Sequence, residues 1–215
     1  MTYLDLMNSV LRRLREEEVT SVTNTTYAKM VGDFINDAKT LVSQATDWSA
    51  LRETITVTTA ASDNTYSLTN SGDNVKVMSV LNDTQNCFIE YQTKDWFNDA
   101  LYIAEAVEGA PKYFTYNGLD SNGDTQVLVG PTPDGVYSLR FDVVKRQGDL
   151  VANTDKLLIP SMPVIHLAVA LLARERGETG GTSTAEYFTI ANQYLSDAVA
   201  IDAAKHPEEM VFRAV

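Results

Sequence analysis

The chain has 215 residues, which is enough for one domain or two small ones with a sizeable core. Its 29 acidic residues outnumber 17 lysines and arginines, and the net charge of −12 disfavours a protein that grips DNA through a basic face. The single cysteine, Cys87, excludes an internal disulfide, and the first ten residues lack the basic and apolar segments of a signal peptide. We therefore expect a soluble protein that is made in a cytoplasm.

A helix is predicted from the start of the chain. Thr2 and Asp5 have the spacing of a capping box, with Asp in place of the usual Glu. The apolar residues behind them repeat at helical spacing and form one stripe: Tyr3, Leu6, Met7, Val10, Leu11 and Leu14. The charged run that follows is expected to be a solvated face, with a partner-facing ridge as the alternative.

A second, longer helix follows after a short polar connection. Asn24 is the expected N-cap, and apolar residues recur at helical period from Tyr27 to Ala45. Asp47 and Trp48 close this helix. Two amphipathic helices joined by a short link are expected to pack antiparallel.

From Leu51 the apolar period changes to two, which indicates strands. Turn-forming residues separate the segments, and a short helix capped by Thr93 interrupts them. The predicted strands are Thr54–Thr58, Tyr66–Leu68, Val75–Leu81, Cys87–Tyr91, Lys112–Tyr116, Gln126–Val129 and Val136–Val144. The second of these is expected to return beside the first, and the fifth and sixth to form a hairpin. About seven short strands with regular turns predict a small antiparallel sandwich or barrel.

The most apolar stretch runs from Ile159 to Glu178 and predicts a helix that is buried on several sides. Pro160 and Pro163 suit its first turn, and Ser161 can cap it. The apolar run is too short to span a bilayer, which takes about 20 apolar residues. We interpret it as the central helix of a bundle, or as a helix shared with a neighbouring subunit.

The last predicted helix begins with a capping box of Ser183 and Glu186 and ends before His206-Pro207. Behind it the sequence ends in EEMVFRAV, whose apolar residues have no local partner stripe: Met210, Val211, Phe212 and Val215. We expect this tail to be mobile in the free protein and to be a partner interface, with a frayed terminus as the alternative.

The order of these elements predicts an α+β fold. Residues 1–50 and 148–215 are expected to form a helical bundle with a C-terminal tail. Residues 51–147 are expected to form a β-rich insertion, a sandwich-like or barrel-like antiparallel domain.

No residues have the spacing of a catalytic, cofactor or metal site. Asp120–Asp124 resembles a calcium loop, but its glycine comes fourth and no Glu follows at the twelfth place, so a hairpin turn is favoured. Gly177–Thr182 lacks the Lys of a phosphate loop and follows a helix, which favours a helix–helix link. His166 lies on an apolar stretch without acidic or cysteine neighbours, which is typical of a core or interface histidine, and Cys87 is expected to serve packing. We expect no enzyme activity, no cofactor and no bound metal.

The element order, the run Phe34-Ile35-Asn36-Asp37-Ala38 and the following Asp47-Trp48 resemble the head-to-tail adaptor proteins of tailed phages, of the tail tubular protein A type. The resemblance implies a structural virion protein in the neck or tail, without catalysis. It also implies a ring of about twelve subunits below the portal that links the capsid vertex to the tail and surrounds the DNA channel. The expected partners are further copies of the chain, the portal and a downstream tail or nozzle protein. DNA would pass without sequence-specific binding, and no membrane is involved.

The resemblance also implies that the C-terminal tail reaches the portal, through Met210, Val211, Phe212 and Val215. An alternative from another class is a β-rich carbohydrate-binding or receptor-binding module of a virion. That module would need aromatic residues exposed on one sheet face, for which Trp48, Trp96 and the ten tyrosines are candidates. A small hydrolase is a weaker alternative, because the sequence offers no nucleophile–base pair.

Overall fold

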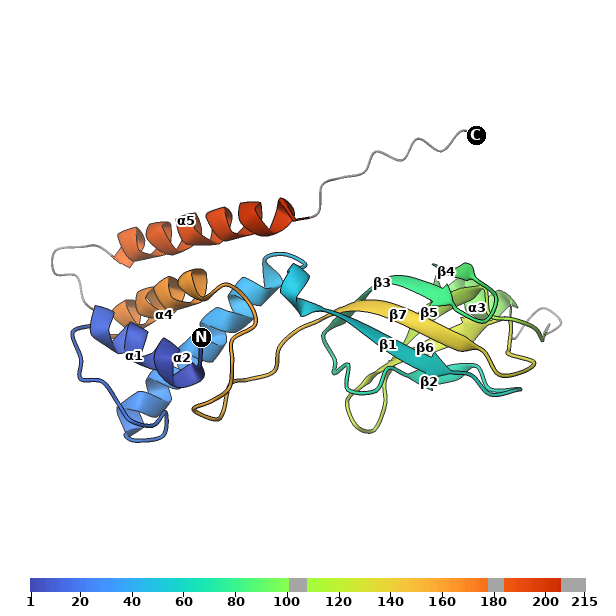
Figure 1. Ribbon diagram of the computed structural model, residues 1–215, viewed down its shortest axis with the longest axis horizontal. Helices are drawn as coiled ribbons and strands as arrows, with labels where there is room; N and C mark the ends of the chain where they lie inside the picture. Colours follow the sequence, from blue (N-terminus) through green and yellow to red (C-terminus); the bar gives the residue numbers. More distant parts are fainter. Residues whose placement is uncertain (101–107, 178–183, 206–215) are drawn as a thin grey trace. The chain divides into compact units, whose positions relative to one another are not determined.

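The computed structural model describes residues 1–100, 108–177 and 184–205 (Figure 1). The chain divides into two compact units, and each is described by itself. The helical unit consists of Met1–Leu51 and Gln147–Val215, and the β unit consists of Arg52–Arg146.

The described residues of the helical unit form four α-helices: α1 (Tyr3–Arg13), α2 (Thr26–Gln44), α4 (Ser161–Glu175) and α5 (Thr184–Ala203). Helix α4 contacts the other three and lies between α5 and the pair of α1 and α2 (Figure 1). Its buried residues point in every direction around the helix, from Val164 and Ile165 to Leu172 and Ala173. The predicted burial of this helix on several sides is confirmed.

The starts of the helices show which local predictions were correct. Thr2 and Asp5 form the predicted capping box of α1. Helix α2, however, is capped by Thr25 and not by Asn24, because the Thr25 hydroxyl accepts a hydrogen bond from the Ala28 amide at 3.0 Å. The predicted cap of α4, Ser161, is also wrong: Pro160 holds the N-cap position, and no side chain caps the helix.

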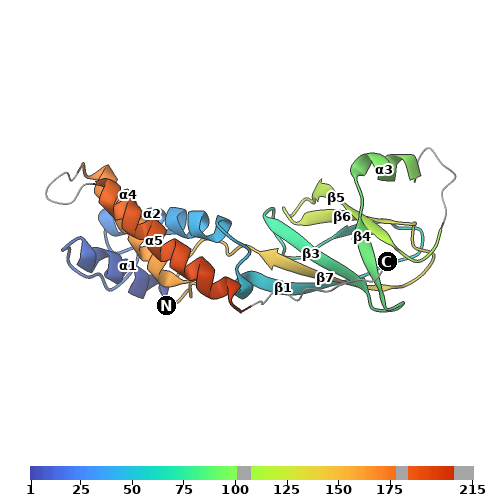
Figure 2. The same cartoon turned by 90° about the horizontal axis from the view of Figure 1, so that it is seen from above.

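Within residues 52–100 and 108–146 the β unit contains seven strands and the short helix α3 (Lys94–Asn98), which Thr93 caps as predicted (Figure 2). The strands are β1 (Arg52–Thr58), β2 (Thr65–Ser67), β3 (Val75–Asn82), β4 (Cys87–Tyr91), β5 (Tyr113–Leu119), β6 (Thr125–Gly130) and β7 (Ser138–Lys145). They form one nearly closed sheet in the order β1-β7-β3-β4-β5-β6-β2.

Two predictions about this sheet are corrected. The sheet is mixed and not antiparallel throughout, because β4 and β5 pair in parallel. Parallel neighbours need a crossover, and the segment between these strands, which includes α3, supplies it. In addition, β2 pairs with β6 and not with β1, whereas the predicted hairpin of β5 and β6 is confirmed.

The core of the β unit lies inside the curved sheet. Its buried residues recur at every second position in the first part of β7, as the period of two predicts, whereas β6 is buried continuously from Val127 to Gly130. The core residues are Leu68, Val80, Ile89, Phe114, Val127, Val129, Leu139, Phe141 and Val143.

Candidate functional site

Asn36, one residue of the run that carries the resemblance to phage adaptors, holds the returning chain against α2 together with Lys39. Asn36 donates from Nδ2 to the Leu150 carbonyl at 3.1 Å, and its Oδ1 accepts from the Leu150 amide at 2.9 Å. Lys39 is 1% exposed and donates from Nζ to the Gly148 carbonyl at 2.6 Å and to the Asp149 carboxylate at 3.1 Å. Residues 148–150 follow the β unit in the chain, so this contact fixes where the chain re-enters the helical unit.

Sequence reasoning missed Lys39. It lies at helical spacing between Ile35 and Val42, within the stripe that becomes buried. A lysine in such a stripe could have predicted a buried polar contact, since an ammonium group is buried only when it is paired and hydrogen-bonded.

A second contact holds the segment before β1, where the short helix η1 (Ser49–Leu51) follows α2. The Asp202 carboxylate in α5 accepts hydrogen bonds from the Ser49 amide at 2.8 Å, from the Ser49 hydroxyl at 2.6 Å and from Lys205 Nζ at 3.0 Å. Burial raises the pKa of Asp202, but the hydrogen bonds from Ser49 and Lys205 outweigh burial and lower the pKa to about 2. Asp202 is therefore charged in the folded protein at neutral pH.

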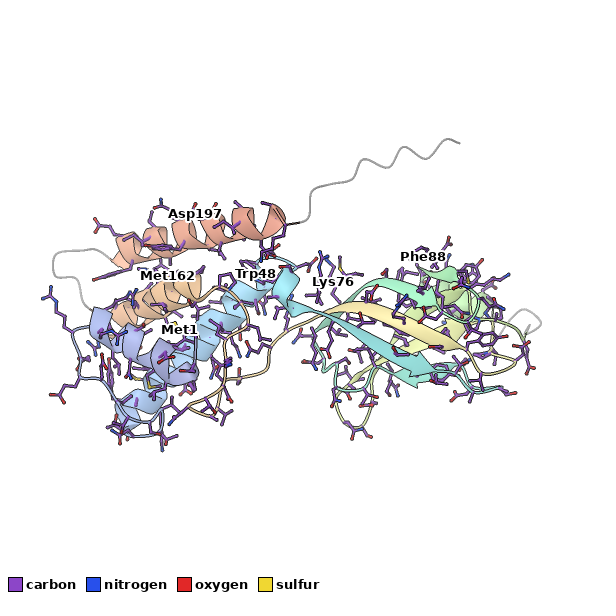
Figure 3. All side chains as sticks on the ribbon, viewed as in Figure 1. Met1, Trp48, Lys76, Phe88, Met162 and Asp197 are labelled. Carbon is purple, nitrogen blue, oxygen red and sulfur yellow. The ribbon has the colours of Figure 1, made fainter. Side chains whose placement is uncertain are left out.

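Trp48, beside this contact, is completely buried, and its indole Nε1 donates to the Val42 carbonyl at 2.9 Å (Figure 3). A buried ring whose N–H is satisfied inside the protein has no face for a ligand. Trp48 is therefore not part of a sugar-binding groove.

His166 lies on α4 and stacks against Tyr194 of α5, with ring centroids 4.3 Å apart and an angle of 14° between the rings. Burial lowers the pKa of His166, and the positive charge of Arg13 adds to the effect. The stack agrees with the interpretation of His166 as a packing residue. Several large apolar side chains in the helical unit remain exposed around these helices: Leu158, Met162, Ile190 and Ile201.

The β unit exposes several aromatic rings, two of which, Tyr91 and Tyr116, line an apolar hollow. Phe88 of β4 is 71% exposed (Figure 3), and Tyr91, Trp96 and Tyr116 are partly exposed. Tyr91, Phe114 and Tyr116 form a cluster with ring centroids 5.7–6.3 Å apart. This aromatic cluster is one wall of a hollow of about 350 Å³ whose other wall is β3, lined by Lys76, Val77, Met78, Ser79 and Val80.

A more polar hollow of about 380 Å³ lies across β1, β7 and β3. At its centre the Asp142 carboxylate accepts hydrogen bonds from the Thr54 hydroxyl at 2.9 Å and from the Ser79 hydroxyl at 3.1 Å. Both hydroxyls belong to the neighbouring strands, so Asp142 ties β1 and β3 to β7. The arrangement stabilises the sheet.

The remaining candidates for chemistry have structural roles or lie outside the described residues. Asp120 accepts hydrogen bonds from the Asn122 and Asp124 amides at 2.8 and 2.9 Å, which confirms the predicted hairpin turn. Residues 178–183 of the predicted helix–helix link, including Ser183, lie outside the described ranges. So do the four apolar residues of the tail: Met210, Val211, Phe212 and Val215. Within the part of the chain that the structure describes, no three His, Cys, Asp or Glu side chains gather in a way that could hold a metal ion.

Comparison with known families decides the class of protein. A family model described as SU10 adaptor protein matches residues 1–210, and so covers both units. The chain belongs to the SU10 adaptor protein family. This SU10 adaptor family membership supports the expectation of a phage adaptor with a structural role, and it does not confirm the tail tubular protein A type. A comparison with curated proteins gave no match. Among the helices that the structure describes, none has the length and hydropathy needed to cross a membrane.

Proposed function

We propose that this adaptor forms a ring of about twelve copies below the portal, which links the capsid vertex to the tail and surrounds the DNA channel. The observation that carries the proposal is the family match across residues 1–210, which includes the β unit and the helical unit up to Met210. The partners are other copies of the chain, the portal and a downstream tail or nozzle protein. The protein resides in the neck of the virion and has no enzymatic role.

The charge of the chain suits a channel that DNA must pass. A wall of subunits that each carry −12 repels the phosphate backbone and gives no sequence-specific contact. A gel-shift titration with duplex DNA at low salt should therefore show no complex, and a stable complex would contradict this part of the proposal.

The C-terminal tail is the proposed portal interface, through Met210, Val211, Phe212 and Val215. Full burial of each apolar side chain gains about 1.5–3 kcal/mol, whereas ordering the tail backbone costs roughly 1–2 kcal/mol per residue. These terms nearly cancel for one subunit, so a single tail binds weakly. In a ring every tail acts together, and linked contacts benefit from a high effective concentration.

Deletion of Glu208–Val215 tests the tail directly. The full-length protein should co-sediment with purified portal particles, and the truncated protein should remain in the supernatant while it keeps its circular dichroism spectrum and melting temperature. Undiminished co-sedimentation of the truncated protein would mean that the tail is a frayed terminus and not the portal interface.

One observation favours the alternative of a carbohydrate-binding or receptor-binding module: the β unit exposes Tyr91 and Tyr116 beside the apolar hollow, and Trp96 where it packs on Tyr113. Sugar binding at the pair of Trp96 and Tyr113 would change the fluorescence of Trp96, and Trp48 would not respond because it is buried. Titration with host surface polysaccharide separates the two functions. A saturable change that is lost in Trp96→Phe would support the module.

A further inference from the structure

Helix α5 leaves an apolar flank uncovered. Its 20 residues include three charged ones, and among its described side chains only Ala191 and Asp202 are buried. Three large apolar residues, Ile190, Tyr194 and Ile201, recur at helical spacing along one flank and are 37–68% exposed. A helix with so few polar residues is normally covered on more than one side. The α5 helix therefore has the composition of a helix that a further partner covers.

Met162 of α4 extends this flank. His166 stacks on Tyr194, and Met162, one turn before His166 on the same side of α4, is 38% exposed (Figure 3). Burial lowers the pKa of His166 and the charge of Arg13, the last residue of α1, lowers it further, so this side of α4 and α5 is the side on which α1 ends. The α4–α5 face consists of Met162, Ile190, Tyr194 and Ile201.

A second apolar stripe lies on α2, on the side turned away from α1. Tyr27, Phe34 and Leu41 recur every seven residues, which is close to two turns of helix. Tyr27 and Phe34 are half-buried, and Leu41 is 52% exposed. Gly32 of the same helix faces α1. At about 100° per residue, Phe34 and Leu41 point about 180–200° away from the direction of Gly32. This α2 stripe and the α4–α5 face therefore lie on opposite sides of the bundle.

We infer that the α2 stripe of one copy packs against the α4–α5 face of the next copy. The inference rests on the proposed ring and names a contact within it. Because the two surfaces lie on opposite sides of one unit, a single head-to-tail contact uses both of them and can repeat until a ring closes. The contact packs helix against helix, and it needs the helical unit alone.

Charges at the edges of the two surfaces favour a second copy as the occupant. Arg13, beside the α4–α5 face, is exposed and donates to the Ser9 carbonyl at 2.9 Å, and no described carboxylate pairs with it. Asp37 lies one turn before Leu41 at the edge of the α2 stripe, is exposed, and pairs with no described cation. Copies that each carry −12 repel one another. A pair of Arg13 and Asp37 across the contact supplies a local attraction against that repulsion.

The ends of the helices set which residues meet. Asp202 of α5 accepts a hydrogen bond from the Ser49 amide, just beyond the end of α2, at 2.8 Å. Leu41, near the end of α2, and Ile201, next to Asp202, therefore lie at the same end of the bundle. Rotation about a ring axis that runs along the helices keeps the two ends of each bundle level with those of its neighbours, so Leu41 meets Ile201 of the next copy.

Cysteine crosslinking on portal particles tests the contact. In a Cys87→Ser background, Leu41→Cys is combined with Ile201→Cys, at positions that are 52% and 68% exposed. A disulfide within one copy leaves a monomer on a denaturing gel, so a ladder of multimers reports contacts between copies alone. The matched control combines Ile201→Cys with Thr40→Cys, which is exposed but points about 100° away from Leu41 around α2.

After mild oxidation the pair at Leu41 and Ile201 should give a ladder about tenfold stronger than the control pair, because neighbours held in a ring have a high effective concentration. Arg13→Glu should weaken this ladder, and Asp37→Arg in the same chain should restore it, with the melting temperature of the unassembled protein unchanged. Rings that assemble on the portal with equally weak ladders from both pairs would overturn the inference and leave the proposed function standing. A crosslink from Ile201→Cys to a portal or tail protein would also overturn it, and failure of any ring to form would overturn both.

Discussion

The backbone N–H and C=O groups of the two units find their hydrogen-bond partners in different ways. In the helical unit, side chains from the helices hold the connecting segments: Asn36 binds both backbone groups of Leu150, and Asn8 binds both of Val19. In the β unit, by contrast, β1 and half of β3 leave edges without a strand partner in the described part of the chain, beside exposed aromatic rings. The connecting segments of the helical unit are therefore held from within, whereas the β unit exposes strand edges and aromatic rings that another molecule can cover.

This difference predicts where substitutions affect stability and where they affect assembly. A buried side chain with an internal hydrogen-bond partner contributes to folding, and its loss lowers the free energy of unfolding. An exposed strand edge or aromatic ring contributes little to the free energy of unfolding, and its contribution to binding begins when a partner covers it. Each buried residue has a matched exposed residue that serves as its control.

The largest effect is expected from the two tryptophans. Trp48→Ala removes a completely buried ring and should lower the free energy of unfolding by about 3–5 kcal/mol. Trp96 is 38% exposed, and Trp96→Ala should cost about 1 kcal/mol. Urea denaturation followed by circular dichroism at the helical band measures both. Equal losses would contradict the distinction between the units.

A smaller effect is expected at Asn36. Asn36→Ala leaves both backbone groups of Leu150 without their partner and should cost about 1–3 kcal/mol. The control is Asn74→Ala in the β unit: the Asn74 side chain is exposed and bonds only to Asp73, so the cost should stay below about 0.5 kcal/mol. Hydrogen exchange at residues 148–150 should rise in the first variant alone. Unchanged exchange there would show that the Asn36 contact does not hold the returning chain.

The third effect depends on pH. The pKa of Asp202 falls from 3.8 to about 2 on folding, so the charged carboxylate contributes stability above about pH 4 that is lost as the pH falls towards 2. Asp202→Asn should therefore cost about 2 kcal/mol or less at pH 7 and progressively less below pH 4. The exposed Asp197 on the same helix provides the control, Asp197→Asn (Figure 3). The free energies of unfolding of the wild type and of Asp202→Asn are compared from pH 6 to pH 2.5. A difference between them that stays constant over this range would contradict the assigned hydrogen bonds.

Local patterns were sufficient to predict much of the fold. The capping box of Thr2 and Asp5, the burial of α4 and the hairpin of β5 and β6 depend on residues close in sequence, and all three predictions are confirmed. The parallel pairing of β4 with β5 and the pairing of β2 with β6 were not predicted. Strand order depends on long-range packing, and alternation within a strand does not specify its neighbour.

The long-range side-chain contacts and the strand edge of β3 were less predictable from the sequence. The run that contains Asn36 led correctly to the phage adaptors as a class, but its physical role requires Leu150, 114 residues away in the chain. Asp202 and Ser49 are 153 residues apart, and nothing in the last helix marks this carboxylate as the partner of a distant amide. The first half of β3 has an open edge because β4 pairs with this strand only over Val80–Asn82. Only the register of the two strands reveals this.

The most direct test of the account is the mass of the complex with the portal. Mass photometry of portal particles saturated with the adaptor should show an added mass of about twelve times 23.7 kDa, which is about 284 kDa. Electron microscopy of the same sample should show a ring on one face of the portal. An adaptor that stays monomeric and adds no mass to the portal at saturating concentration would contradict the central claim.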